Sequence, residues 1–136
     1  LLDYVATTNS VLSHSFAISG RGVLDKSSSK VYAHFYPTFS WYKPEDTTDF
    51  LLKHEQSHFD ITEIHARKLR KRIQEFTFTT NSEEEVKKLY DITEAERRAM
   101  QQQFDNETDH SRDRQQEFVW ASKIRDLLER YWVYTP

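Results

Sequence analysis

Residues 51–76, LLKHEQSHFDITEIHARKLRKRIQEF, decide the fold of this chain because they carry the pattern of one long amphipathic helix. At about 100° per residue, apolar residues and histidines gather along one side of this helix, and charged residues lie opposite. The members of this side are Leu51, His54, Glu55, His58, Thr62, His65, Leu69, Ile73 and Phe76. The pattern predicts a helix that begins near Asp46-Thr47-Thr48, which are good N-cap residues, and ends near Gln74.

The same helix carries the motif H-E-x-x-H as His54-Glu55-Gln56-Ser57-His58. Side chains four residues apart lie on one face of a helix, with Cβ atoms about 6 Å apart, so that two imidazoles can bind one metal ion. Glu55 is the next residue and can reach a water on that metal. This arrangement is typical of zinc-dependent peptidases. The alternative is a helix whose two histidines are ordinary core residues.

A catalytic zinc normally takes three protein ligands and leaves one position for water. His65 follows His58 by seven residues, about 10.5 Å along the helix axis, which is too far to share a metal. His65 is predicted to be a core histidine or to help orient a metal ligand without binding the metal itself. A glutamate on a following helix is one alternative for the third ligand, and the available ones are Glu83, Glu84, Glu85, Glu94 and Glu96. His110 is the better candidate because it lies in a polar loop without a packing role, although an ordinary surface histidine is the other interpretation.

Composition excludes several classes of protein. The chain has 136 residues and no cysteine, so we expect a single domain, 1–136, in which histidine, aspartate or glutamate must hold any metal. A formal net charge of −3 gives no general attraction to nucleic acid or to anionic membranes. No apolar run approaches the roughly 18 residues of a membrane span. The start of the chain also lacks the pattern of a signal peptide.

The pattern before Pro44 has a period of two residues, which predicts strands. One face carries Leu12, His14, Phe16 and Ile18, and a second strand carries Val31, Ala33 and Phe35. Gly20, Gly22 and the polar residues 25–29 are predicted to form the turn between them. A small antiparallel sheet of two to four strands follows from this pattern.

Helical patterns occupy the rest of the chain. The second helix is predicted to open at Ser82, with Glu85 completing a capping box. A polar loop at 105–111 separates it from a last helix at about 112–131. The predicted buried residues of that helix are Phe118, Ala121, Ile124, Leu127 or Leu128, and Tyr131. The predicted fold class is α+β, a small antiparallel sheet packed on about three helices, zincin-like, with the metal site on the first long helix.

The chain also resembles a known bacterial family of unknown function whose members are predicted secreted zinc-dependent proteases. The resemblance lies in the run 51–63, followed by Ala66-Arg67-Lys68-Leu69-Arg70. Ser40-Trp41 before the helix and Phe104-Asp105-Asn106-Glu107-Thr108-Asp109-His110 downstream also resemble it, over about residues 30–130. The resemblance implies a secreted or periplasmic setting and supports His110 as the third ligand. One position departs from the pattern, since Ser111 stands where a glycine is usual.

These features predict a zinc metallopeptidase with one Zn²⁺ per chain and a peptide or protein substrate. His54, His58 and His110 are the predicted ligands, and Glu55 is the predicted general base. Tyr90 and Tyr131 are candidates for the group that stabilises the oxyanion. The alternative is a catalytically inactive domain of the same fold that binds metal or a partner.

Overall fold

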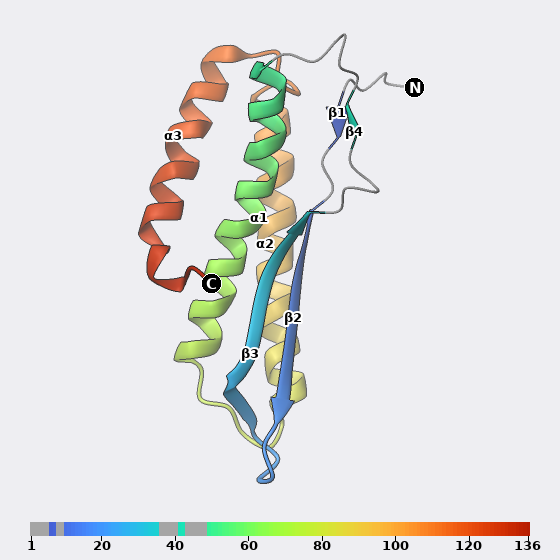
Figure 1. The fold of residues 1–136 in the computed structure, drawn as a ribbon, viewed down its shortest axis with the longest axis vertical. Coiled ribbons are helices and arrows are strands. Elements are labelled where there is room, and N and C mark those ends of the chain that lie inside the picture. Colours follow the sequence, from blue (N-terminus) through green and yellow to red (C-terminus); the bar gives the residue numbers. More distant parts are fainter. Residues whose placement is uncertain (1–5, 8–9, 36–40, 43–48) are drawn as a thin grey trace.

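The computed structural model describes residues 6–7, 10–35, 41–42 and 49–136, and Figure 1 shows their arrangement. The strands come first: β1 (Ala6–Thr7), β2 (Ser10–Ile18), β3 (Leu24–Phe35) and β4 (Trp41–Tyr42). The helices follow: α1 (Asp49–Glu75), α2 (Ser82–Glu107), α3 (Arg114–Arg130) and a short 3-10 helix, η2 (Trp132–Tyr134). The α+β class predicted from the sequence is confirmed.

The strands form two separate antiparallel pairs. β2 and β3 make a long hairpin, and the two-residue strands β1 and β4 pair with each other. The hairpin turns between Ser19 and Val23, where the Ser19 N–H donates to the Val23 carbonyl at 2.8 Å. Gly22 has φ +80° in this turn, a conformation that glycine adopts without steric cost.

The predicted turn at residues 25–29 is wrong, because these residues belong to β3, and residues 26–29 form an irregular bulge in that strand. Pairing passes from Ser15–Lys30 directly to Ala17–Asp25, so residues 26–29 lie opposite a single residue of β2. The Ser28 hydroxyl accepts a hydrogen bond from the Ala17 N–H at 2.8 Å and takes the place of a backbone partner. Serine side chains that satisfy the backbone in this way explain why a polar stretch remains within a strand.

α1 is the central element and is buried on two sides. One cluster joins it to the hairpin and to α2, through Leu12, Leu24, Val31, Ala66, Leu69, Ile73, Phe78 and Val86. A second cluster joins it to α2 and α3, through Ile61, Ile64, Phe104, Trp120 and Ile124. Figure 1 shows α1 between the hairpin and α3, with α2 behind it. Neighbouring elements therefore hold the helix that carries H-E-x-x-H on both sides.

The helix ends lie within a few residues of the predicted ones, whereas the predicted caps differ. α2 begins at Ser82 as predicted and continues to Glu107, so residues 105–107 of the predicted loop are helical. α1 ends at Glu75, one residue beyond the prediction, while the predicted N-cap residues 46–48 lie outside the described residues. The capping box at Ser82 is wrong. The Ser82 hydroxyl instead accepts from the Leu24 N–H at 2.8 Å, and the Glu85 carboxylate accepts from the Thr79 N–H at 2.9 Å. These side chains connect the start of α2 to β3 and to the preceding loop.

The face of α3 that packs on the core differs from the predicted one. Phe118 is 74% exposed and Ala121 is exposed, whereas Glu117 and Trp120 are buried. Ile124 is buried as predicted. Within the described residues, no helix is both long and apolar enough to cross a membrane.

Candidate metal centre

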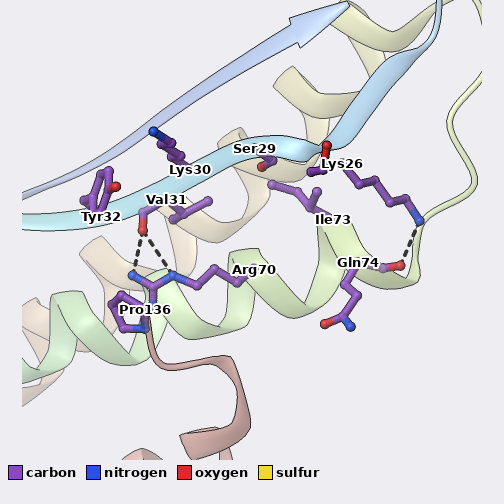
Figure 2. Close-up of a pocket in the computed structure, with 10 residues that line it drawn as sticks. Lys26, Ser29, Lys30, Val31, Tyr32, Arg70, Ile73, Gln74 and Pro136 are labelled. Atoms are coloured by element: carbon purple, nitrogen blue, oxygen red, sulfur yellow. Dashed lines mark hydrogen bonds between the residues drawn. The ribbon is translucent and has the colours of Figure 1, made fainter. Parts of the chain in front are cut away.

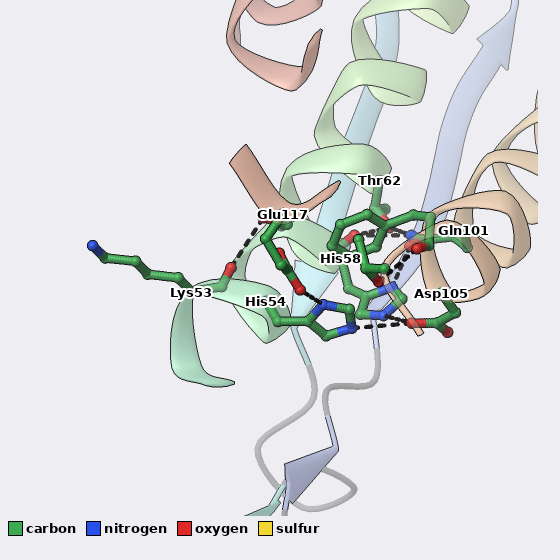
Figure 3. Close-up of polar contacts among 10 residues, drawn as sticks. Lys53, His54, His58, Thr62, Gln101, Asp105 and Glu117 are labelled. Carbon is green, nitrogen blue, oxygen red and sulfur yellow. Dashed lines mark hydrogen bonds and ion pairs between the residues drawn. The ribbon is translucent and has the colours of Figure 1, made fainter. Parts of the chain in front are cut away.

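His54 and His58 lie one turn apart on α1, and their Nε2 atoms point to the same carboxylate on α2. The Oδ1 atom of Asp105 is 3.0 Å from Nε2 of His54 and 2.7 Å from Nε2 of His58. Figure 3 shows the two imidazoles converging on this oxygen. One atom from each of the three residues can be chosen so that all lie within 4.8 Å of one another, a spacing that suits one metal ion. In the part of the chain that the structure describes, these residues form the one such group.

The second ring nitrogen of His54 bonds to a buried carboxylate on α3. Its Nδ1 atom makes a short hydrogen bond to Oε1 of Glu117. His54 is 3% exposed and Glu117 is 8% exposed, so little water reaches this pair. A buried carboxylate needs a donor to offset its lost hydration, and the imidazole N–H provides one.

The second ring nitrogen of His58 bonds to an amide on α2. Its Nδ1 atom lies 2.5 Å from Oε1 of Gln101. The amide nitrogen of Gln101 donates to the His58 carbonyl at 2.8 Å and to the Thr62 hydroxyl at 3.1 Å. Because these two acceptors fix the orientation of the amide, its oxygen must be the atom that faces His58. Nδ1 of His58 is therefore a donor.

An aromatic side chain closes one side of the group. The ring of Phe104 stacks on His54 with centroids 4.4 Å apart and meets His58 edge-on at 5.0 Å. Phe104 is fully buried and contacts Trp120 of α3 at 5.4 Å. This apolar wall lowers the local dielectric, which strengthens electrostatic interactions at the site.

The charges at the site depend on one another. Burial works against the charged form of His58, but hydrogen bonds and the charges of Asp105 and Glu55 outweigh it and raise the pKa of the imidazole. Burial likewise favours the neutral form of Asp105, but the two histidines hold the pKa of this carboxyl far below its usual range. Asp105 is therefore ionised at neutral pH and available as an anionic ligand.

The sequence predicted His110 as the third ligand, and the structure places it just beyond α2. Its backbone N–H donates to the Asp105 carbonyl at 2.9 Å, and its side chain is exposed. The chain leaves the helix axis here, because Asp109, His110 and Ser111 have φ values of +47°, +52° and +82°. His110 as a ligand stays a prediction, and the structure adds Asp105 as the residue that meets both histidines.

The other predicted residues lie away from the three-residue group. His65 is fully buried in the core, and its Nδ1 atom donates to the Ile61 carbonyl at 2.7 Å. Tyr90 precedes Asp105 by 15 residues on α2, about 22 Å along the axis, and its hydroxyl donates to the Leu12 carbonyl at 2.7 Å. Tyr131 follows the last residue of α3 and caps that helix. A role in stabilising the oxyanion stays a prediction for both tyrosines.

Sequence reasoning missed Asp105, Gln101 and Glu117 as parts of the site. One signal was available for Glu117. It shares a face with Trp120 and Ile124 at helical spacing, and a carboxylate on an apolar face requires a buried partner. Gln101 offered no comparable signal, because glutamine is also common on exposed helix faces.

A cavity of about 520 Å³ lies between β3 and the last turns of α1, far from His54 and His58. Figure 2 shows Arg70 at its edge, where the guanidinium donates to the Val31 carbonyl at 2.6 and 3.0 Å. Arg70 follows His58 by 12 residues, about 18 Å along the helix. Among the described residues that line this cavity there is no histidine, aspartate or glutamate side chain, so they offer no comparable metal site.

Comparison with known proteins assigns the family. No curated protein and no solved structure matches the chain. A family model described as "Bacterial protein of unknown function (DUF922)" matches residues 40–111, which is more than half of the chain. The matched segment includes both histidines of the motif as well as Asp105 and His110. The chain therefore belongs to this bacterial family of unknown function.

Proposed function

We propose that this protein is a zinc-dependent peptidase whose metal centre is formed by His54, His58 and Asp105. The convergence of two Nε2 atoms and one carboxylate oxygen is the observation that carries the proposal. A set of two imidazoles and one carboxylate suits zinc, and three protein ligands leave a position for water. The extracytoplasmic setting implied by the sequence resemblance belongs to the same proposal.

The chemistry follows from this set of donors. Zinc held by these residues would act as a Lewis acid, able to lower the pKa of a water toward about 7 and to polarise a substrate carbonyl. His54 and His58 would hold the metal through Nε2 as neutral imidazoles, and Asp105 would contribute a negative charge. Phe104 restricts water on one side of the histidines and keeps these interactions strong.

Glu55 is the proposed general base. It is adjacent in sequence to His54, is half-buried, and lies close enough to His58 for its charge to raise the pKa of that imidazole. A carboxylate in this place accepts a proton from the attacking water and delivers it to the leaving amine. This step requires an ionised Glu55 and a peptide carbonyl beside the metal ligands.

The variant Glu55→Gln tests the proposal with zinc-loaded protein and a mixture of fluorogenic peptides. The amide has the same shape but cannot accept the proton, so we expect zinc to remain bound while hydrolysis falls by several orders of magnitude. Glu84→Gln, an exposed residue in the first turn of α2, is the matched control and should cleave as the wild type does.

Hydrolysis retained by Glu55→Gln would remove Glu55 as the base. Zinc-loaded wild-type protein that cleaves no peptide in a broad library would favour the inactive metal-binding domain instead.

A further inference from the structure

We propose that Glu117 and Gln101 are positioning residues that hold the imidazoles of His54 and His58 with the proton on Nδ1 and the lone pair of Nε2 directed to the metal. The inference rests on the metal site of the proposed function and is independent of peptidase activity. It assigns a role to α3, which lies outside the segment that the family model matches.

The argument begins with the chemistry of a histidine ligand. A neutral imidazole has one N–H and one lone pair, so a proton on Nδ1 leaves Nε2 free to bind metal. An acceptor at Nδ1 fixes both this tautomer and the orientation of the ring. Both ligand histidines have such an acceptor, Glu117 on α3 for His54 and Gln101 on α2 for His58.

Burial makes the bond to Glu117 specific. Glu117 is 8% exposed, and His54 is 3% exposed. Without Glu117, the Nδ1–H of His54 would lose its acceptor in a place that water hardly reaches. The ring would then be free to turn or to exchange tautomers, and a fraction of the molecules would present the wrong nitrogen to the metal.

The bond to Gln101 is fixed by a chain of hydrogen bonds that reaches the hairpin. The hydroxyl of Ser10 in β2 lies 2.8 Å from the Thr62 hydroxyl, and Thr62 accepts from the Gln101 amide at 3.1 Å. Figure 3 shows Thr62, Gln101 and His58 in this sequence. The amide therefore cannot rotate without breaking bonds to Thr62 and to the His58 carbonyl.

The two supports differ in charge, and this difference gives the proposal a distinct signature. The carboxylate bonded to Nδ1 of His54 makes that imidazole a more basic ligand. The neutral amide bonded to Nδ1 of His58 only fixes the orientation of the ring. Glu117→Gln removes the charge and keeps an acceptor, while Glu117→Ala removes both. The loss of zinc affinity should therefore increase in the order Gln, then Ala.

Competition with a chromogenic chelator measures these affinities in the full chain. We expect zinc binding to weaken about 10-fold in Glu117→Gln, up to about 100-fold in Glu117→Ala, and by about 10-fold or more in Gln101→Ala. Glu129→Gln on α3 and Gln102→Ala on α2 are exposed controls and should stay within about twofold of the wild type.

The NMR spectrum of the zinc-loaded protein gives a second readout that a purely structural role would not change. The Nδ1–H proton of His54 should be visible and slow to exchange in the wild type and in Glu129→Gln. It should be lost or broadened in Glu117→Ala.

Unchanged zinc affinity in both Glu117 variants, with the Nδ1–H signal retained, would overturn the proposal even if those variants were less stable. If Glu117→Ala does not fold, Glu117→Gln and Gln101→Ala decide the question in the same assay. A wild-type chain that binds no zinc would overturn the proposed function as well, whereas zinc binding that ignores these substitutions would overturn this inference alone.

Discussion

Three residues in succession have left-handed backbone conformations directly after α2. Asp109, His110 and Ser111 have φ values of +47°, +52° and +82°, and none of them is glycine. For a residue with a Cβ atom this conformation costs about 1–2 kcal/mol. The strained segment lies next to Asp105, whose carbonyl accepts from the His110 N–H. Strain beside a candidate metal ligand is typical of functional sites.

Replacing Ser111 by glycine should therefore stabilise the protein by about 1 kcal/mol, because glycine adopts φ +82° without steric cost. Ser122 is exposed in the middle of α3, and its replacement by glycine should instead destabilise by about 0.5 kcal/mol. Urea unfolding of both variants checks the pair. Destabilisation by Ser111→Gly would contradict the backbone conformation described at this position.

His65 is a second residue whose environment has a measurable effect. It is fully buried, and burial lowers its pKa from 6.5 to about 4. Its Nε2 atom has no hydrogen-bond partner among the described residues. Between these two pKa values the unfolded chain binds the extra proton, so the contribution of His65 is present above pH 6.5 and is lost as the pH falls toward 4.

The contribution of His65 to the free energy of unfolding should fall by about 2 kcal/mol between pH 7 and pH 5. The variant His65→Asn keeps a donor for the Ile61 carbonyl and cannot titrate. Its stability at pH 7 should be lower than that of the wild type, but it should fall less on acidification. Parallel urea titrations at the two pH values measure the difference, and equal pH slopes would exclude His65 as the group responsible.

At this scale the sequence predicted the part of the site that is local. His54 and His58 follow from spacing along one helix, because residues four apart lie on the same face. Glu55 as the general base stays a prediction. Asp105, Gln101 and Glu117 come from two other helices, and their place depends on how those helices pack. Spacing in the sequence carries no information on that packing.

At the scale of the elements, α1 is buried over more of its surface than the single apolar side predicted from the sequence. The predicted side includes Thr62, Leu69 and Ile73, which are buried as expected. Ile61 and Ile64 lie outside that side and are fully buried against α2 and α3. A helix at the centre of a fold is covered on more than one side, so its buried surface is wider than one stripe.

The orientation of α3 can be tested with two aromatic residues that are two positions apart. Trp120 is 1% exposed in the cluster with Ile61, Ile64, Phe104 and Ile124, whereas Phe118 is 74% exposed. Trp120→Ala should cost about 3–5 kcal/mol, and Phe118→Ala should change stability by less than about 0.5 kcal/mol. Chemical denaturation checks both variants, and comparable losses would contradict the described face of α3.

The hairpin of β2 and β3 was predicted only in part from the sequence. β2 and the inner face of β3 follow from alternation of apolar residues, and both strands are confirmed. The bulge at residues 26–29 could not be predicted, because a run of serines is typical of turns. Its strand conformation depends on the Ser28 hydroxyl meeting the Ala17 N–H across the pair.

For the whole molecule, the candidate metal centre joins elements that are distant in the sequence. His54 and His58 come from α1 and Asp105 from α2, while Glu117 of α3 bonds to His54. A metal that binds only the folded protein should therefore stabilise the three-helix arrangement as a unit.

Zinc at about 100 times its dissociation constant should raise the free energy of unfolding by about 2.7 kcal/mol. This corresponds to a rise in Tm of about 10 °C for a chain of this size. A chelator should reverse the rise. Thermal melts monitored by circular dichroism measure both effects. The variant His54→Ala should melt at the same temperature with and without zinc, and a zinc-dependent shift in that variant would indicate a different binding site.

The zinc content of the purified chain, prepared without a histidine tag, tests the central claim most directly when wild type is compared with Asp105→Ala and His110→Ala. The proposed zinc centre predicts about one zinc per chain in the wild type, loss of zinc in Asp105→Ala, and retention in His110→Ala. Loss in His110→Ala with retention in Asp105→Ala would contradict the ligand set and give the third position to His110. A wild-type chain that binds no zinc when the metal is supplied would contradict the metal centre itself.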